Sequence, residues 1–318
     1  MIWYIKKCNF CASDKVVKKG KQLGVQRYKC LDCGKQFQNK RRKGKLQKKI
    51  WNEYTSGKQT ATELGNKYNR SRQWISKQLN EINVDDEIIT SIMPQSIVVV
   101  ADATFMSRSY GILVFREPNL KVNLVWKEIY SETPGQYDQL KTKLENFGYH
   151  IDAVVLDGKM GVRNVFGNIP AQMCQFHQVA IVNRYLTRKP ILEAGKELRT
   201  IALQLKSSNE QEFTKLLNKW HTEWQNFLKE KTVNIMTNKW YYTHKRIRSA
   251  YRSLKTNLPY LFTYQKYPEL NIPNTCNSID GSNTTLKNLL RIHRGLNREN
   301  RYKMICQILK NSCPRKLT

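Results

Sequence analysis

Five short apolar runs in the middle of the chain each have the length of one strand. Gln95–Phe105 is a continuous run rich in valine, and Ile151–Leu156 is another, the pattern of strands buried on both faces. The five predicted strands are Gln95–Phe105, Gly111–Phe115, Lys121–Ile129, Ile151–Leu156 and Met173–Phe176. Helical spacing across Tyr137–Phe147 predicts a helix between the third and fourth of these strands. The order βββαβαβ indicates an α/β domain.

Apolar residues before this region recur at helical spacing in three short segments. Leu46, Ile50 and Tyr54 share one face of a helix that ends at Gly57. Thr60, with Glu63 three residues later, has the capping-box pattern that begins a second helix, and Ser71 is the predicted cap of a third, whose apolar residues are Ile75, Leu79 and Ile82. The outline is that of a helix-turn-helix motif, and an ordinary helical hairpin with a solvated basic face has the same pattern.

The segment 179–275 is also predicted to be helical. Its clearest apolar stripe is far more typical of core than of ligand surface, and it consists of Phe213, Leu217, Trp220, Trp224 and Phe227. A second cluster interleaves aromatic and basic side chains: Trp240, Tyr241, Tyr242, His244, Lys245, Arg246 and Arg248. Such a cluster can stack on unpaired bases and hold phosphates, and scaffold is its other interpretation.

Charge divides the chain in the same places. Lys and Arg number 55 against 25 Asp and Glu, a formal balance of +30. Residues 1–82 hold 21 basic and 5 acidic side chains, residues 83–174 hold 8 and 11, and residues 175–318 hold 26 and 9. Clustered Lys and Arg give sequence-independent affinity for phosphates, so nucleic acid is the expected partner. An acidic segment between basic flanks is typical of an enzyme whose carboxylates bind metal ions while its basic regions bind DNA.

Four of the eight cysteines have the spacing of a metal site. Cys8 and Cys11 form one CxxC pair, and Cys30 and Cys33 form another after 18 intervening residues. Two residues between cysteines let one tight turn direct both thiolates at one ion, so the spacing predicts a zinc ribbon over residues 1–40 with a structural Zn²⁺ ion. The N-terminus has no apolar core of a signal peptide, and no 18-residue apolar run predicts a membrane span.

The helix-turn-helix outline, residues 44–84, supplies candidate DNA contacts. In such a motif the second helix of the pair enters the major groove, and side chains near its N-terminus reach base edges. The candidates there and in the preceding basic run are Arg41, Arg42, Arg70, Arg72, Gln73 and Lys77. Double-stranded DNA is therefore the predicted partner of this part of the chain.

Two aspartates mark the ends of the two most apolar runs. Asp102 lies near the C-terminal end of the first, and Asp157 follows the second. Carboxylates on neighbouring strands can share hard divalent cations such as Mg²⁺, and a pair of such ions supports in-line displacement at phosphorus. A single strand-end aspartate is often only a cap or a turn former; two of them in an acidic segment of a basic protein favour a metal site.

Two stretches carry a resemblance to a known family. Asp157–Arg188 includes a Cys174-x-x-His177 element, and Asn277–Leu296 includes an Asn-Ser-acid-Gly signature around Asp280. With the four-cysteine segment, the chain resembles bacterial DDE transposases of the Mutator-like class, insertion-sequence enzymes with an N-terminal zinc ribbon. The resemblance covers nearly the whole chain.

The resemblance implies a ribonuclease-H-like catalytic domain over 95–178 and 276–312, interrupted by a helical insertion over 179–275. It implies that Asp102, Asp157 and Asp280 bind two Mg²⁺ ions, with Mn²⁺ as a substitute. The family generally has Glu at the third position, so Asp280 is a departure that shortens the reach by one methylene group. Glu269 and Glu299 are the rival third acids. We expect Glu299 to be solvated and Glu269 to lie in a loop.

Cys174 and His177 raise the alternative of a second zinc site, but the sequence shows no partner pair for them. We therefore interpret them as neighbours of the catalytic acids, where His177 either orients an acid or contacts the scissile phosphate; a histidine packed beside the last strand is the other interpretation.

The sequence as a whole predicts a DNA transposase that cleaves and joins the terminal inverted repeats of its own element and target DNA. The resemblance further implies a homo-oligomer in the bacterial cytoplasm, associated with the nucleoid. The alternatives are a transposase-derived DNA-binding regulator without activity and a nuclease that cuts but does not join.

Overall fold

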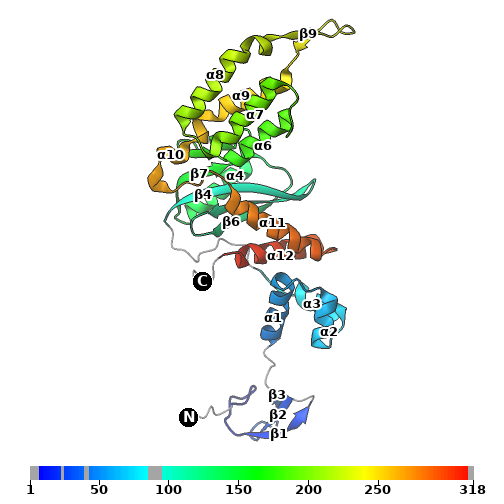
Figure 1. Ribbon diagram of the computed structural model, residues 1–318. Coiled ribbons are helices and arrows are strands. Elements are labelled where there is room, and N and C mark those ends of the chain that lie inside the picture. Colours follow the sequence, from blue (N-terminus) through cyan, green and yellow to red (C-terminus); the bar gives the residue numbers. More distant parts are fainter. Residues whose placement is uncertain (1–6, 23–24, 39–42, 85–94, 314–318) are drawn as a thin grey trace. The chain divides into compact units, whose positions relative to one another are not determined.

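A computed structural model describes residues 7–22, 25–38, 43–84 and 95–313 (Figure 1). The chain divides into two compact units, Met1–Ile82 and Asn83–Thr318, which are described separately.

The first unit begins with a small antiparallel sheet that holds two cysteine turns. Its strands, in the order β1-β2-β3, are β1 (Val16–Gln22), β2 (Val25–Cys30) and β3 (Gln36–Gln38). Phe37 of β3 stacks on Tyr28 of β2, and these rings with Cys8 and Cys30 make up a very small apolar core. An apolar core this small cannot stabilise a fold by itself. The stability of this sheet therefore depends on a link between its cysteines, such as a bound metal ion.

Three helices complete the first unit: α1 (Lys43–Ser56), α2 (Ala61–Tyr68) and α3 (Arg72–Asn80). The predicted caps are confirmed. Thr60 and Glu63 form a reciprocal capping box at α2, and the Ser71 hydroxyl accepts from the Trp74 amide at α3. Ile50, Leu64 and Ile75, one from each helix, are fully buried. The apolar spacing thus holds the three helices around one core.

The second unit is built on a mixed five-stranded sheet in the order β6-β5-β4-β7-β8. The strands are β4 (Ser96–Ser107), β5 (Tyr110–Glu117), β6 (Val122–Ile129), β7 (His150–Leu156) and β8 (Ala171–Met173). β4, β5 and β6 pair antiparallel, whereas β7 and β8 continue the sheet in parallel with β4. A short helix, α5 (Val162–Val165), lies between β7 and β8, so the predicted order βββαβαβ is confirmed.

The predicted fifth strand was placed two to three residues too late. β8 ends at Met173, and Cys174 is the N-cap of a helix, α6 (Gln175–Leu186), whose first backbone bonds include the Gln178 amide to the Cys174 carbonyl. The buried residues Gln178, Val182 and Leu186 then follow helical spacing, so the helical period overrides the short apolar run Met173–Phe176.

Helices cover both faces of the sheet. Ile97, Val99 and Ala101 of β4 share one core with residues of α4 (Pro134–Asn146). On the other face, α11 (Asn277–Ile292) contacts β4, and α12 (Arg298–Asn311) contacts β6 through a bond from Trp126 Nε1 to Cys306 Sγ. Successive β4 residues point to opposite faces, so the residues at even positions, including Asp102, face the α11 side.

The chain between β8 and α11 forms a second core, beside the sheet in Figure 1. Its elements are α6, α7 (Glu193–Leu203), a 3-10 turn (Gln204–Lys206), α8 (Glu210–Lys229), the hairpin β9 (Lys231–Val233) and β10 (Trp240–Tyr242), α9 (Lys245–Leu261), α10 (Thr263–Lys266) and a 3-10 turn (Pro268–Leu270). Phe213, Leu217 and Trp220 are buried in this core, and Trp224 and Phe227 pack against it. The interpretation of that stripe as core is confirmed.

Candidate active site and metal centres

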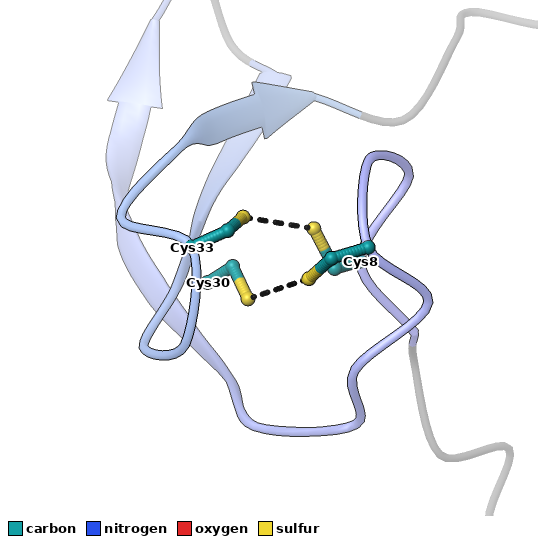
Figure 2. A group of neighbouring side chains, drawn as sticks. Cys8, Cys30 and Cys33 are labelled. Atoms are coloured by element: carbon teal, nitrogen blue, oxygen red, sulfur yellow. Dashed lines mark hydrogen bonds between the residues drawn. The ribbon is translucent and has the colours of Figure 1, made fainter.

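The four N-terminal cysteines converge from two turns (Figure 2). Their sulfurs all lie within 4.8 Å of one another, with 3.6 Å between Cys8 and Cys33 and 3.6 Å between Cys11 and Cys30. Zn–S bonds of about 2.3 Å place the corners of a tetrahedron about 3.8 Å apart, so this spacing fits one zinc ion. The cluster can therefore hold a metal such as zinc, as its spacing predicts.

Backbone amides support the thiolate form in this cluster. The Phe10 amide donates to Cys8 Sγ over 3.4 Å, and the amides of Cys33 and Asp32 lower the pKa of Cys30 to about 6, despite its burial. The thiolate is the form that binds a metal. The turns thus favour ionised sulfur at Cys8 and Cys30, whereas hydrogen bonding with the other cysteines raises the pKa of Cys11.

Strand register places the two predicted strand-end acids level with each other. β4 and β7 pair in parallel up to Val100 opposite Val155, so Asp102 and Asp157 each follow the last pair by two residues. β4 continues to Ser107, two residues beyond the predicted end at Phe105, so Asp102 lies just past the end of the parallel ladder rather than at the end of its strand. The chain after Asp157 turns away sharply at Gly158, whose φ of +91° suits glycine.

Asp280, far along the sequence from Asp102, lies close enough for its charge to act on Asp102. It lies in the first turn of α11, and Asn283, three residues later on the same helix, donates from Nδ2 to Asp102 Oδ2 over 2.8 Å. Asn283 is 5% exposed, and its Oδ1 atom has no hydrogen-bond partner. α11 therefore brings the Asn283 amide into contact with Asp102 and carries Asp280 one turn before it.

The charges of the other two acids act on Asp102. Burial, together with the negative charges of Asp157 and Asp280, raises the pKa of Asp102 to about 7. Burial also raises the pKa of Asp280, against the opposing charge of His177. Carboxylates gathered in this way repel each other unless a proton or a cation lies between them.

A fourth carboxylate, Glu132, was missed by the sequence reasoning. It precedes α4 and accepts from Tyr137 Oη over 2.7 Å, while burial and the charge of Asp157 raise its pKa. Its charge also acts on Asp102. Glu132 lies in a short polar segment between β6 and α4. The one feature of the sequence that could have indicated it is its position shortly before Pro134, which begins the helix.

The two rival third acids lie elsewhere. Glu299 is on α12, paired with Lys303 over 2.7 Å and largely exposed, as predicted. Glu269 is exposed, in a 3-10 turn rather than an irregular loop, and it lines a pocket with Ser96 and Ile97 at the opposite end of β4 from Asp102. Of the three candidates, Asp280 is the one whose charge acts on Asp102.

Cys174 and His177 gain a partner that the sequence did not reveal. Cys276, the N-cap of α11, joins them, and ligand atoms of the three side chains all lie within 4.8 Å of one another. Hydrogen bonding from Cys276 and His177 lowers the pKa of Cys174 to about 4, and the bond to Cys174 raises that of His177 to about 9. Cys276 is about 100 residues from Cys174, so no local spacing could indicate it.

Basic side chains line a pocket between β4 and α11. It has a volume of about 400 Å³ and lies between the end of β4, at Phe105, and the C-terminal part of α11. Its basic lining residues are Lys287, Arg291, His293, Arg294 and Arg301. A pocket of this charge attracts anions such as phosphate groups.

The predicted contacts on the first unit are surface residues. Arg70, Arg72, Gln73 and Lys77 are all exposed. The first three lie at or near the start of α3, whereas Lys77 lies in its last turn. The Arg70 guanidinium lies 5.6 Å from the Trp74 ring centre. Arg41 and Arg42 lie outside the described residues.

The aromatic and basic cluster of the helical segment lies on its hairpin and the following helix. Lys231 lies over the exposed Trp240 ring and Arg248 over Tyr242, at 4.0 and 3.6 Å from the ring centres. Its role in binding unpaired bases stays a prediction.

Comparison of the chain with protein-family models and with curated proteins gave no match. Among the described residues, none of the helices combines the length and the apolar character that crossing a bilayer requires.

Proposed function

We propose that this chain is a DNA transposase with a ribonuclease-H-like catalytic domain. The observation that carries the proposal is that Asp102 and Asp157 both follow the last pair of the parallel ladder, and that the charges of Asp157 and Asp280 act on Asp102. The strand order β6-β5-β4-β7-β8, antiparallel on one side of β4 and parallel on the other, supports the fold assignment.

The donor set fits a hard divalent cation. Carboxylate oxygens are the ligands that Mg²⁺ prefers, and Asn283 Oδ1, buried without a partner, adds one more oxygen. Asp102, Asp157 and Asp280 would hold the metal. Bound there, two Mg²⁺ ions would activate an attacking oxygen and stabilise the leaving one during displacement at phosphorus.

The protein's own residues have separate tasks in this proposal. Asn283 fixes the orientation of the Asp102 carboxylate through its 2.8 Å bond. Arg291 and Arg294 hold the phosphate backbone beside the acids, and the exposed side chains of α3 bind duplex DNA as the second helix of a helix-turn-helix pair. In the proposed reaction, water first hydrolyses one strand at the element's end, and the released 3′-hydroxyl then attacks target DNA.

The decisive experiment uses labelled DNA that contains the sequences flanking the gene, incubated with the full chain and Mg²⁺. We expect cleavage and joined products with wild type, and neither with Asp102→Asn. Asp138→Asn is the matched control because Asp138 is an exposed carboxylate on α4, and it should retain activity. Equal activity of Asp102→Asn and wild type would refute the proposal.

The alternative function is a DNA-binding regulator derived from a transposase. The observation that favours it is Asp280, whose carboxylate reaches one methylene group less than the usual Glu. It predicts specific DNA binding without Mg²⁺-dependent cleavage. Cleavage without joined products would instead indicate a nuclease.

A further inference from the structure

The helical segment leaves the sheet and returns to it at one narrow neck. Cys174 ends the strand side of the neck, and Cys276 begins α11 on the other side. The Gln175 amide donates to the Asn274 carbonyl over 3.0 Å, and the Asn274 side-chain amide donates to Gln175 Oε1 over 3.2 Å. The two chain segments are therefore held side by side before any metal is considered.

The three side chains at this neck have the ligand types of a soft-metal site. Two cysteine sulfurs and one imidazole nitrogen lie within 4.8 Å of one another, the same limit as for the four N-terminal cysteines. Cys174 and His177 are three residues apart at the start of α6, so one helical turn directs both at one point. Thiolate and imidazole favour zinc over the hard cations that suit the neighbouring carboxylates.

The surroundings of these three side chains favour a metal site over ordinary packing of buried thiols. The Cys276 amide donates to Cys174 Sγ over 3.3 Å, the kind of backbone bond that orients a metal-bound thiolate. Cys174 and Cys276 have no exposed surface. His177 Nδ1 is buried without a hydrogen-bond partner, which is costly for a nitrogen in a protein interior unless something binds there.

We propose that Cys174, His177 and Cys276 bind one zinc ion, with the fourth position open to water, and that this ion fastens α11 to the end of β8. Three protein ligands and one open position are a common zinc arrangement. The ion would close the neck at the point where about 100 residues of chain leave the sheet. This proposal does not rest on the transposase activity.

A zinc ion bound at the neck would also set the position of Asp280 in the proposed catalytic site. The Asp280 amide donates to the Cys276 carbonyl over 3.1 Å, so Asp280 lies one helical turn from a proposed ligand, and Asn283 lies about one turn further. Fixing Cys276 fixes the first turn of α11, and with it the distance of Asp280 from Asp102. Cys174, His177 and Cys276 are in this sense positioning residues.

Zinc content of the purified full chain tests the proposal. We expect two zinc ions per chain for wild type, one for Cys174→Ser/Cys276→Ser, and one for Cys8→Ser/Cys11→Ser. The matched control is Cys306→Ser/Cys313→Ser, which changes two buried cysteines of the same unit outside the cluster and should leave two zinc ions. One zinc ion in wild type, lost with Cys8→Ser/Cys11→Ser and retained with Cys174→Ser/Cys276→Ser, would overturn it.

Cobalt substitution keeps the test decisive if the serine variant at the neck does not fold. Cys8→Ser/Cys11→Ser, which leaves the second unit unaltered, should still bind one Co²⁺ ion with thiolate charge-transfer bands about half as intense as those of a four-thiolate site. A Co²⁺ spectrum without thiolate bands would refute the site. A disulfide between Cys174 and Cys276, seen as six free thiols instead of eight in denatured protein, would also refute it.

Discussion

Replacing Asp102 by Asn should stabilise the magnesium-free protein more strongly as the pH rises. Asp102 is 8% exposed, and burial together with Asp157 and Asp280 raises its pKa from 3.8 to about 7. The folded protein therefore binds a proton that the unfolded chain has already lost between these two values. The Asp102 carboxyl does not lower the free energy of unfolding below pH about 4. It lowers that free energy progressively as the pH rises, and the loss is complete above pH 7.

The magnitude follows from the two pKa values. At about 1.4 kcal/mol for each tenfold difference in proton affinity, the full cost above pH 7 is ~4 kcal/mol, of which ~3 kcal/mol develops between pH 5 and pH 8. Asn keeps an oxygen for the Asn283 amide but carries no charge. The difference in stability between variant and wild type should therefore grow by up to ~3 kcal/mol over that pH range.

Urea unfolding followed by circular dichroism at pH 5 and pH 8 measures this difference, in magnesium-free buffer without a chelator so that bound zinc is retained. Asp138→Asn is the control and should show no growth with pH. A gap that stays constant or shrinks from pH 5 to pH 8 would show that Asp102 ionises freely. Added Mg²⁺ at pH 8 should stabilise wild type more than Asp102→Asn, since the proposed site needs the carboxylate.

Three further predictions concern other parts of the chain. Trp220→Ala should destabilise the second unit by about 3–5 kcal/mol in the same urea assay, because Trp220 is 2% exposed and donates from Nε1 to the Ala194 carbonyl. Thr60→Ala should cost about 1 kcal/mol by removing the capping box of α2, whereas Thr285→Ala, on the exposed side of α11, should cost much less in thermal unfolding. Arg291→Ala/Arg294→Ala should weaken DNA binding and make its affinity less dependent on salt, by the equivalent of about two phosphate contacts. If the slope of log affinity against log salt concentration does not change, the basic pocket does not bind DNA.

Local patterns in the sequence predicted most of the elements and the first metal centre. The strands 95–105 and 151–156 and the caps Thr60 and Ser71 depend on neighbouring residues alone, so period and capping chemistry were sufficient. The cysteine cluster was predictable for the same reason, since two CxxC turns leave little freedom in where the sulfurs point.

The missed features are those that depend on contacts between distant residues. Cys276 joins Cys174 only because the helical segment returns to its starting point, and Asn283 meets Asp102 across 181 positions. Neither has a local pattern that distinguishes it from a packed core residue. The Met173–Phe176 error has another physical cause: a short apolar run fits the end of a strand and the start of a helix equally well.

Glu132 and Asp280 compete for the place of third metal ligand, and their surroundings differ in a testable way. The Glu132 carboxylate already accepts from Tyr137 Oη and faces Lys159 at 4.0 Å, so part of its charge is compensated. Asp280 has the charge of His177 nearby, and it shares α11 with the Asn283 amide that holds Asp102. Asp280 is thus linked to Asp102 through one helix, whereas Glu132 lies before α4 and has its own pKa raised by the charge of Asp157.

If Asp280 is the ligand, Asp280→Asn should abolish Mg²⁺-dependent cleavage, whereas Glu132→Gln should lower its rate and raise the Mg²⁺ concentration needed for half-maximal activity. Glu145→Gln, on an exposed residue of α4, is the control for the second variant. The reverse outcome, with Glu132→Gln inactive and Asp280→Asn only weakened, would assign the third ligand to the segment before α4. In that case the one-methylene shortening at Asp280 would have no bearing on activity, because the carboxylate of α11 would serve only to place charge beside Asp102.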